Sequence, residues 1–291
     1  MKFKSIFIIF DAIILFFLLL LTVMPVFTLG PSMTPSFLAS IWPLFLVFLL
    51  ALIFLNVFYA VKYPLFRLLE MEDWPALIRY LEQKVIQEGH YSASLVRLLA
   101  NTYLVMSDSA GVTSFEAKVA IAKPALLESN ALIFGTARIL RGDYTGATLF
   151  FKNRLHGNSR RGLGLRFPSG RAKRYRDWLQ WYYGFSLLLD RQFEEAAGQF
   201  KALAASSADA VVTGLASWFL FDVLAKNMDQ GETALTSAGE GRARLLKDIK
   251  TRKDWEKEGA RLEIEVHAAI LKKYIDKAAD WIYGAEKGAF T

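Results

Sequence analysis

The chain begins with two long apolar runs, SIFIIFDAIILFFLLLLTVMPVFTL at residues 5–29 and FLASIWPLFLVFLLALIFLNVFYAV at residues 37–61. The first run contains one ionisable residue, Asp11, and the second contains none. At about 1.5 Å per helical residue, each run is long enough to cross about 30 Å of hydrocarbon. The intervening GPSMTPS at residues 30–36 is uncharged and rich in helix breakers, so it predicts a tight turn. We therefore expect residues 1–62 to form a hairpin of two transmembrane helices.

A cleavable signal peptide is the competing interpretation of the first run, because Lys2 and Lys4 precede it. The run is longer than the apolar region of a signal peptide, and no small-residue cleavage site is evident near Pro25. A second run of equal length also follows. These features favour a membrane anchor.

The positive charges near the runs predict the orientation of the hairpin. Lys2 and Lys4 precede the first run, Lys62 and Arg67 follow the second, and the turn between the runs is uncharged. Basic residues favour the cytoplasmic side, so we expect both termini there. Asp11 lies only a few residues after Lys4, and we expect it to stay hydrated near the headgroups rather than to mark an ion path.

Composition excludes several kinds of catalytic site. The 291-residue chain contains no cysteine, which rules out disulfides, thiolate zinc sites and cysteine nucleophiles. It has three histidines, and although Glu263 and His267 are four residues apart, no third metal ligand is evident near them. No nucleotide-binding or hydrolase motif occurs. We expect no catalytic residue, no metal and no cofactor, and a protein that is not an enzyme.

Residues 63–291 have apolar residues at three-and-four spacing, interrupted by loop signals near residues 88, 107–111, 142, 156–170, 206 and 229–231. We see no strand alternation. The pattern predicts an all-α domain of consecutive antiparallel helices.

This domain contains an internal repeat of a glycine, an aromatic residue, an alanine and a phenylalanine, spaced 9, 3 and 4 residues apart. The two copies are Gly135, Tyr144, Ala147 and Phe151, and Gly184, Phe193, Ala196 and Phe200. The glycine permits a close approach of two helices, the alanine fills the crossing and the aromatic residues wedge between them. The repeat predicts helical hairpins.

The repeat resembles the tetratricopeptide repeat (TPR), which has glycine, alanine and an aromatic residue at its eighth, twentieth and twenty-fourth positions. The early tryptophan of that family is replaced by Ala131 in one copy and Gln180 in the other, where Trp181 lies one place off. The closing proline is absent. A weaker half-copy lies at Trp74, Leu77 and Leu81. The resemblance implies a TPR-like domain of antiparallel helix pairs whose surface binds peptides or helices of other proteins.

The C-terminal region has an apolar helix face with the spacing 4, 3, 4, 3, 4. Its members are Ile264, Ala268, Leu271, Ile275, Ala278 and Ile282. Barely three heptads are present, so we expect a helix that caps the domain rather than an intermolecular coiled coil.

One segment, residues 152–176, carries nine positive charges and no negative charge, whereas the whole chain has a net charge of +7. The nine residues are Lys152, Arg154, Arg160, Arg161, Arg166, Arg171, Lys173, Arg174 and Arg176. The two repeat copies are 49 residues apart, about 15 more than the TPR period of about 34. We interpret the segment as an irregular insertion, rich in glycine, whose last turn can enter the helix that carries Trp178, and all nine cations are candidate contacts for an anionic partner.

Three occupants of the basic segment remain open. Anionic phospholipid headgroups attract such a segment on the cytoplasmic side of a membrane. An acidic protein is equally compatible with its arginines. Nucleic acid ranks lowest, because Phe167 and Tyr175 are the only aromatic residues for base stacking. A solvated loop without a partner is the simplest alternative.

Together these features predict an integral protein of a bacterial inner membrane, with a TPR-like domain at residues 63–291 in the cytoplasm. We expect a scaffold or adaptor that recruits or organises other proteins of a membrane-bound assembly. The alternative is a membrane-bound enzyme or accessory subunit that binds an anionic lipid or lipid-linked substrate through the basic segment.

Overall fold

A computed structural model describes residues 3–157, 169–228, 231–262 and 271–284. The chain divides into two compact units, Met1–Leu81 and Glu82–Thr291. The described residues are all-α, without a strand, as the sequence predicts. We describe the two units separately.

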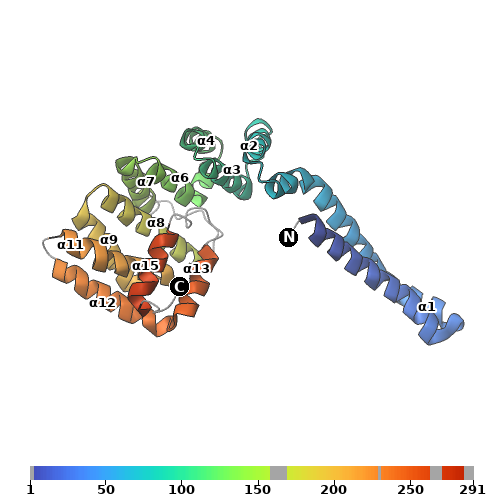
Figure 1. Cartoon of the computed structure of the whole chain (residues 1–291). Helices are drawn as coiled ribbons and strands as arrows, with labels where there is room; N and C mark the ends of the chain where they lie inside the picture. Colours follow the sequence, from blue (N-terminus) through green and yellow to red (C-terminus); the bar gives the residue numbers. More distant parts are fainter. Residues whose placement is uncertain (1–2, 158–168, 229–230, 263–270, 285–291) are drawn as a thin grey trace, which may run out of the picture. The chain divides into compact units, whose positions relative to one another are not determined.

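The first unit is dominated by α1 (Phe3–Glu70), which doubles back on itself to form a hairpin (Figure 1). Ring centroids of Phe7 and Tyr59 lie 4.3 Å apart, and those of Phe17 and Phe48 lie 6.5 Å apart, so the two legs are antiparallel. The backbone remains helical through residues 30–36. The chain therefore reverses through a bent helix, and not through the non-helical turn that the breakers predict.

The two legs contact each other along a narrow seam and expose most of their remaining apolar side chains. In the first leg the less exposed positions include Phe7, Asp11, Ile14 and Leu18, a spacing of 4, 3 and 4 that keeps one helix face toward the partner. Phe54 in the second leg is 73% exposed. Two helical stretches, Ser5–Met24 and Ala39–Glu70, could cross a membrane by length and composition.

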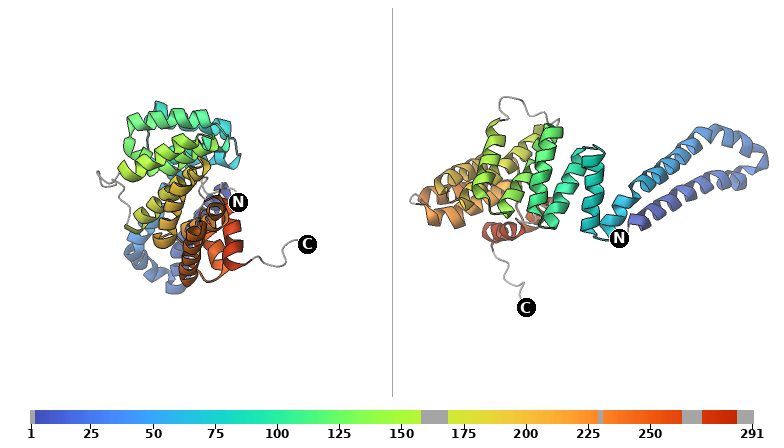
Figure 2. Two further views of the ribbon diagram at one scale, coloured as in Figure 1. Left: turned by 90° about the vertical axis from the view of Figure 1, so that its left-hand side faces the viewer. Right: turned by 90° about the horizontal axis from the view of Figure 1, so that it is seen from above.

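A short helix, α2 (Trp74–Glu82), follows the hairpin. The second unit then consists of helices η1 (Gln83–Gln87), α3 (Ala93–Val105), α4 (Ser109–Ala122), α5 (Pro124–Ser129), α6 (Ala131–Leu140), α7 (Tyr144–Gly157), α8 (Ser169–Leu189), α9 (Phe193–Ser206), α10 (Ala210–Phe219), η2 (Leu220–Leu224), α11 (Ala225–Asn227), α12 (Gly231–Asp248), α13 (Arg252–Leu262) and α15 (Lys272–Tyr283). From α3 to α9 the helices run back and forth beside one another (Figures 1 and 2).

One turn geometry joins the helices at four places. Glu72, Ser107, Gly142 and Arg191 each have a positive φ, between 53° and 78°. At each turn this residue donates its N–H to the carbonyl three residues back, and the next residue donates to the carbonyl five residues back. This is the Schellman arrangement that ends a helix. The turns are 35, 35 and 49 residues apart, so a recurring helical hairpin begins earlier in the chain than the clear sequence repeat indicates.

The start of the second helix is also repeated at three of these turns. The residue after the turn is Asp73, Asp108 or Asp143, and its carboxylate accepts the N–H of the residue three places later. An aspartate in this position satisfies a free N–H group at the helix N-terminus. The fourth turn has Gln192, for which no side-chain cap is recorded.

The sequence repeat lies at equivalent places in two helix pairs, α6–α7 and α8–α9. Ala147, Phe151, Ala196 and Phe200 are fully buried. A methyl group added to Gly135 would overlap the Phe151 ring. In the other pair, a methyl added to Gly184 would lie 3.2 Å from Phe200. Tyr144 and Phe193 are partly exposed. The glycines thus allow the close helix crossings.

The C-terminal helix α15 packs against α10 within the same chain. The Tyr274 ring lies 5.3 Å from Phe219 and 5.9 Å from Phe185. Of the predicted apolar face, Leu271, Ala278 and Ile282 are buried, Ile275 is partly exposed, and Ile264 and Ala268 lie outside the described residues. α15 therefore completes the core, and α10 is buried all round.

Candidate functional site

The basic segment is helical at both of its ends. Lys152 and Arg154 lie on α7, and Arg171, Lys173, Arg174 and Arg176 lie on the first turns of α8. Arg160, Arg161 and Arg166 lie outside the described residues. The irregular insertion expected over 152–176 is therefore corrected at its two flanks. The physical reason is that both helices have aromatic residues that pack into the core.

Tyr175 fixes the first turns of α8. Its hydroxyl donates to the Glu128 carbonyl at 2.7 Å and accepts the Ala131 N–H at 3.1 Å, which joins α8 to the junction of α5 and α6. Burial raises the pKa of Tyr175, so the hydroxyl keeps its proton for this bond. Because Tyr175 points inward, its basic neighbours on α8 are left on the surface.

Four cations, those of Arg171, Lys173, Arg174 and Arg176, are exposed on α8. We call them the α8 basic surface. Exposed cations of this kind attract carboxylates or phosphates over a Debye length of about 8–10 Å. Lys152 is exposed as well, on α7.

Arg154 has a different environment. Its Nε lies 3.5 Å from a Glu128 carboxylate oxygen, and its guanidinium lies 4.4 Å from the centroid of Phe150. Arg138 lies 4.3 Å from the same ring and pairs with Glu116 at 2.7 Å. Arg154 thus links α7 to α5 within the fold, and its role as a candidate partner contact is replaced by a structural one.

We expect Arg154→Gln to lower the free energy of unfolding by about 1 kcal/mol, because it removes an ion pair and a cation–π contact that are partly shielded from water. The matched change Lys152→Gln removes an exposed charge from the same helix and should change stability by less than about 0.5 kcal/mol. Urea unfolding followed by tryptophan fluorescence compares them. If the two variants were equally stable, Arg154 would have no structural role and would again be a candidate contact for an anionic partner.

Below the α8 basic surface lies a buried carboxylate that the sequence did not single out. Asp177 accepts the Ser207 hydroxyl at 3.0 Å and the Ala208 N–H at 2.7 Å. These bonds tie α8 to the turn between α9 and α10. Both bonds are accepted by Oδ2, and a buried carboxylate that accepts such donors stabilises a turn, so we interpret Asp177 as structural.

Asp209 caps α10 at the same turn. It accepts the N–H groups of Val211 and Val212 at 3.0 and 3.1 Å, and the Trp178 indole N–H at 3.3 Å. Burial raises its pKa, while the hydrogen bonds and the positive charge of Arg174 act in the opposite direction. The signal available in the sequence was an aspartate immediately before an apolar helix, which is typical of a cap.

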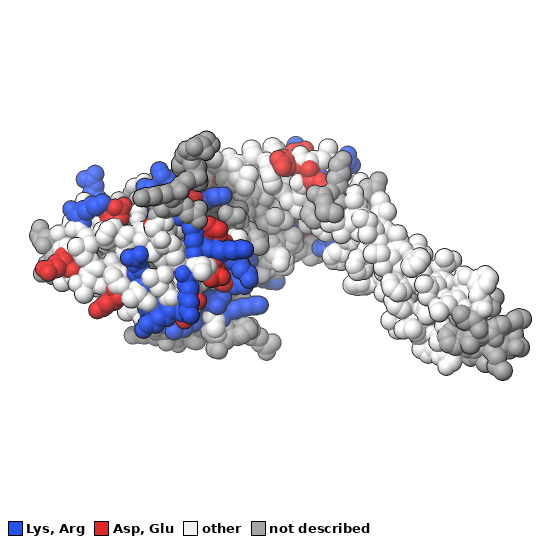
Figure 3. Space-filling model, turned by 60° about the horizontal axis from the view of Figure 1, so that its bottom comes forward, with Lys and Arg blue, Asp and Glu red and all other residues white. Residues whose placement is uncertain are grey.

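A second basic face lies on the C-terminal helices. Figure 3 shows Lys and Arg side chains gathered over this part of the molecule. Lys250, Lys253 and Lys257 are exposed at a spacing of 3 and 4 residues along and just before α13. Acidic residues alternate with them in the sequence, so the charge pattern of the sequence gave no signal for this face.

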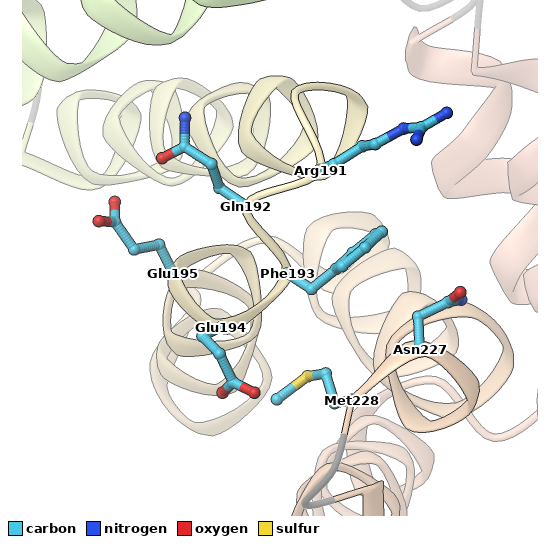
Figure 4. A pocket seen from close by; sticks show the side chains of 7 residues that line it. All are labelled: Arg191, Gln192, Phe193, Glu194, Glu195, Asn227 and Met228. Atoms are coloured by element: carbon cyan, nitrogen blue, oxygen red, sulfur yellow. The ribbon is translucent and has the colours of Figure 1, made fainter.

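An open pocket of about 390 Å³ lies where the α8–α9 turn meets the end of α11 (Figure 4). Its lining residues are Arg191, Gln192, Phe193, Glu194, Glu195, Asn227 and Met228. Figure 4 shows these side chains on the α8–α9 turn, at the start of α9 and at the end of α11. No group of three potential metal ligands occurs among the described residues. The pocket lining combines the apolar Phe193 and Met228 with the carboxylates of Glu194 and Glu195, and it offers no evident chemistry.

Comparison with known proteins shows the family. A family model described as "Uncharacterised Treponema protein" matches residues 111–284, more than half of the chain. The chain belongs to this family. It is also 24% identical over 246 residues to an "Uncharacterized protein" of Treponema pallidum (strain Nichols), a match that covers 82% of this chain and 74% of that protein.

The family match contains both sequence repeats, the basic segment and the carboxylates Asp177 and Asp209. The apolar hairpin precedes the matched residues. What the family model describes is thus most of the second compact unit.

Proposed function

We propose that the protein is a membrane-anchored scaffold that recruits or organises other proteins of a membrane-bound assembly. The observation that carries this proposal is the hairpin, whose legs bury only Ile14 and Leu18 among the described apolar residues of α1. An apolar surface of this extent is stable in a lipid environment and not in water. The hairpin carries a helical domain whose surface is available to partners.

The lysine and arginine distribution supports a cytoplasmic helical domain and cytoplasmic termini, because Lys2, Lys4, Lys62 and Arg67 flank the two legs. The Treponema relatives support a bacterial setting, and so an inner membrane.

The TPR-like character of the domain is part of the proposal. It is supported by the recurrence of one turn geometry at 35-residue intervals and by the close glycine–phenylalanine crossings of the two repeat copies. The inner helices α6 and α10 are buried along almost their whole length. These two helices leave little surface for a partner, so we expect a partner to bind elsewhere on the domain, on surfaces such as the α8 basic surface.

We infer that the partner at the α8 basic surface is an acidic protein. Arginine is suited to carboxylates because its planar group donates two parallel hydrogen bonds, and three of the four cations are arginines. In the accessory-subunit alternative, an anionic lipid binds the same four cations. An experiment distinguishes these two kinds of partner.

The test replaces Arg171, Lys173, Arg174 and Arg176 with glutamine. The matched control makes the same change at four exposed lysines elsewhere, Lys247, Lys250, Lys253 and Lys257. After cross-linking in intact cells, we expect a high-mass complex of the wild-type chain that is lost in the first variant and retained in the second. Loss in both, or in neither, would contradict a partner at this surface.

The lipid alternative has its own measurement. In vesicles of the purified protein, a lipid contact would slow tryptic cleavage at Arg171–Arg176 when anionic phospholipid replaces zwitterionic phospholipid. We expect no such protection. Digestion of sealed, oriented vesicles also reports on topology, and cleavage of the helical domain from the periplasmic side alone would reverse the proposed orientation.

A further inference from the structure

Among the side chains of the hairpin that the structure describes, a polar contact joins the two legs. The side-chain amide Nδ2 of Asn56 donates to a carboxylate oxygen of Asp11 at 3.2 Å. Asp11 occupies the seam between the legs and is partly exposed. Asn56 lies at the edge of the seam and is exposed. The pair is therefore open to whatever surrounds the hairpin.

After its hydrogen bonds are formed, this pair still has acceptor oxygens but no remaining side-chain donor. Asn56 Nδ2 also donates to the Leu52 carbonyl at 3.0 Å, so both amide hydrogens are used. The amide oxygen of Asn56 and the second carboxylate oxygen of Asp11 remain. Within the described residues, no donor is recorded for either oxygen. The outward face of the pair accepts hydrogen bonds and carries negative charge.

The pair lies inside the apolar runs, and this placement of Asp11 within the membrane replaces the hydrated position near the headgroups that we expect from the sequence alone. Asp11 is six residues from the start of the first run and Asn56 five residues from the end of the second, which is about 7–9 Å along a helix at about 1.5 Å per residue. Exposed neighbours such as Phe10, Leu15 and Val57 are apolar. An acidic group at such a depth normally pairs with another polar group or faces a water-filled cavity.

We propose that Asp11 and Asn56 form a recognition site, within the membrane, for a transmembrane helix of another protein that carries a lysine or arginine at the matching depth. This inference rests on the proposed membrane hairpin. A cation satisfies two acceptor oxygens at once and neutralises the carboxylate, and an apolar helix does neither. The site extends recruitment from the surface of the helical domain into the bilayer.

A second copy of this chain does not fit the site. Neither apolar run contains a lysine or an arginine. Another hairpin at the same depth would bring a second carboxylate against the first, and like charges repel most strongly where the dielectric is low. The occupant therefore comes from a different protein.

The experiment reconstitutes the full chain in zwitterionic vesicles with a synthetic transmembrane peptide of leucine and alanine. One peptide carries a single lysine at the depth of Asp11, and its matched control carries leucine there. The chain lacks cysteine, so Ser5→Cys supplies a single site for a fluorophore, and energy transfer to a labelled peptide measures association.

We expect the lysine peptide to associate about tenfold more tightly than the leucine peptide. Asp11→Asn keeps the size and polarity of the side chain but removes its charge, and should reduce this preference to less than about threefold. Thr22→Leu changes a polar residue of the same leg whose hydroxyl donates a hydrogen bond to the Leu18 carbonyl. That control variant should keep the full preference.

Equal binding of the two peptides to the wild-type chain, or an unchanged preference in Asp11→Asn, would overturn the inference. So would self-association of labelled chains as strong as the binding of the lysine peptide. Each sample is also extracted with alkaline carbonate. Release of the chain from the membrane would disprove the membrane hairpin itself. A chain that stays in the membrane but binds both peptides equally would disprove this site alone.

Discussion

Gly135→Ala should destabilise the helical domain by about 3 kcal/mol, because the added methyl group would overlap the ring of Phe151. Both residues are buried, and Phe151 also stacks on Tyr182 at 5.7 Å, so the ring has little freedom to move aside. The full chain in detergent, unfolded thermally and followed by tryptophan fluorescence, gives the measurement.

Two other glycines supply the controls. In the second repeat copy, Gly184→Ala meets Phe200 at 3.2 Å and should destabilise by less than about 1 kcal/mol. Gly198 faces open space within α9, so Gly198→Ala should stabilise by about 0.5–1 kcal/mol through helix propensity. A loss at Gly135 no larger than at Gly184 would show that the α6–α7 crossing is not as close as described. Adding Phe151→Leu to Gly135→Ala should recover part of the stability.

Trp181→Ala should lower the free energy of unfolding by about 4 kcal/mol, as expected when a buried aromatic residue is removed from a core. Trp181 is fully buried, and its ring lies 5.1 Å from Phe185, 5.7 Å from Phe219 and 6.1 Å from Phe200. It therefore joins α8 to both α9 and α10. Urea unfolding monitored by circular dichroism gives the value.

Trp281→Ala is the matched control, because Trp281 is partly exposed and stacks on Phe221 at 5.0 Å near the C-terminal edge. It should cost about 1–2 kcal/mol. Trp181→Phe tests the cause further. The Trp181 indole N–H has no hydrogen-bond partner in the structure, so the phenylalanine variant loses volume but no polar contact and should fall between the other two. Similar losses at Trp181 and Trp281 would contradict the central position of Trp181.

The position of Trp181 in the core could not be predicted from the TPR pattern alone. Trp181 is one place away from the position that the TPR pattern requires, and that place is held by Gln180. In the structure Gln180 is partly exposed and bonds to Gln199 at 3.2 Å, while Trp181 is in the core. The core position of this helix is therefore held by Trp181, one residue after the place that the pattern requires.

The charge pattern was less informative. Nine cations in one segment predicted one basic surface, but Arg154 is occupied by Glu128 and Phe150 inside the fold. No sequence pattern distinguishes this arginine from Lys152, because its ion-pair partner, Glu128, comes from another helix. The second basic face gave no signal in the sequence, because acidic residues alternate there with its lysines.

By itself, the sequence determined the features that depend on local periodicity and composition: the two apolar runs, the all-α class and the glycine, alanine and phenylalanine positions of the helix pairs. These follow from hydrophobicity and helical spacing, which act within a few residues along the chain. Only the tertiary structure decided that Asp11 meets Asn56, that Asp177 holds a distant turn and that α15 packs on α10. Those contacts join residues 30 or more positions apart, and such pairings are set by how whole helices pack against one another, which no local pattern records.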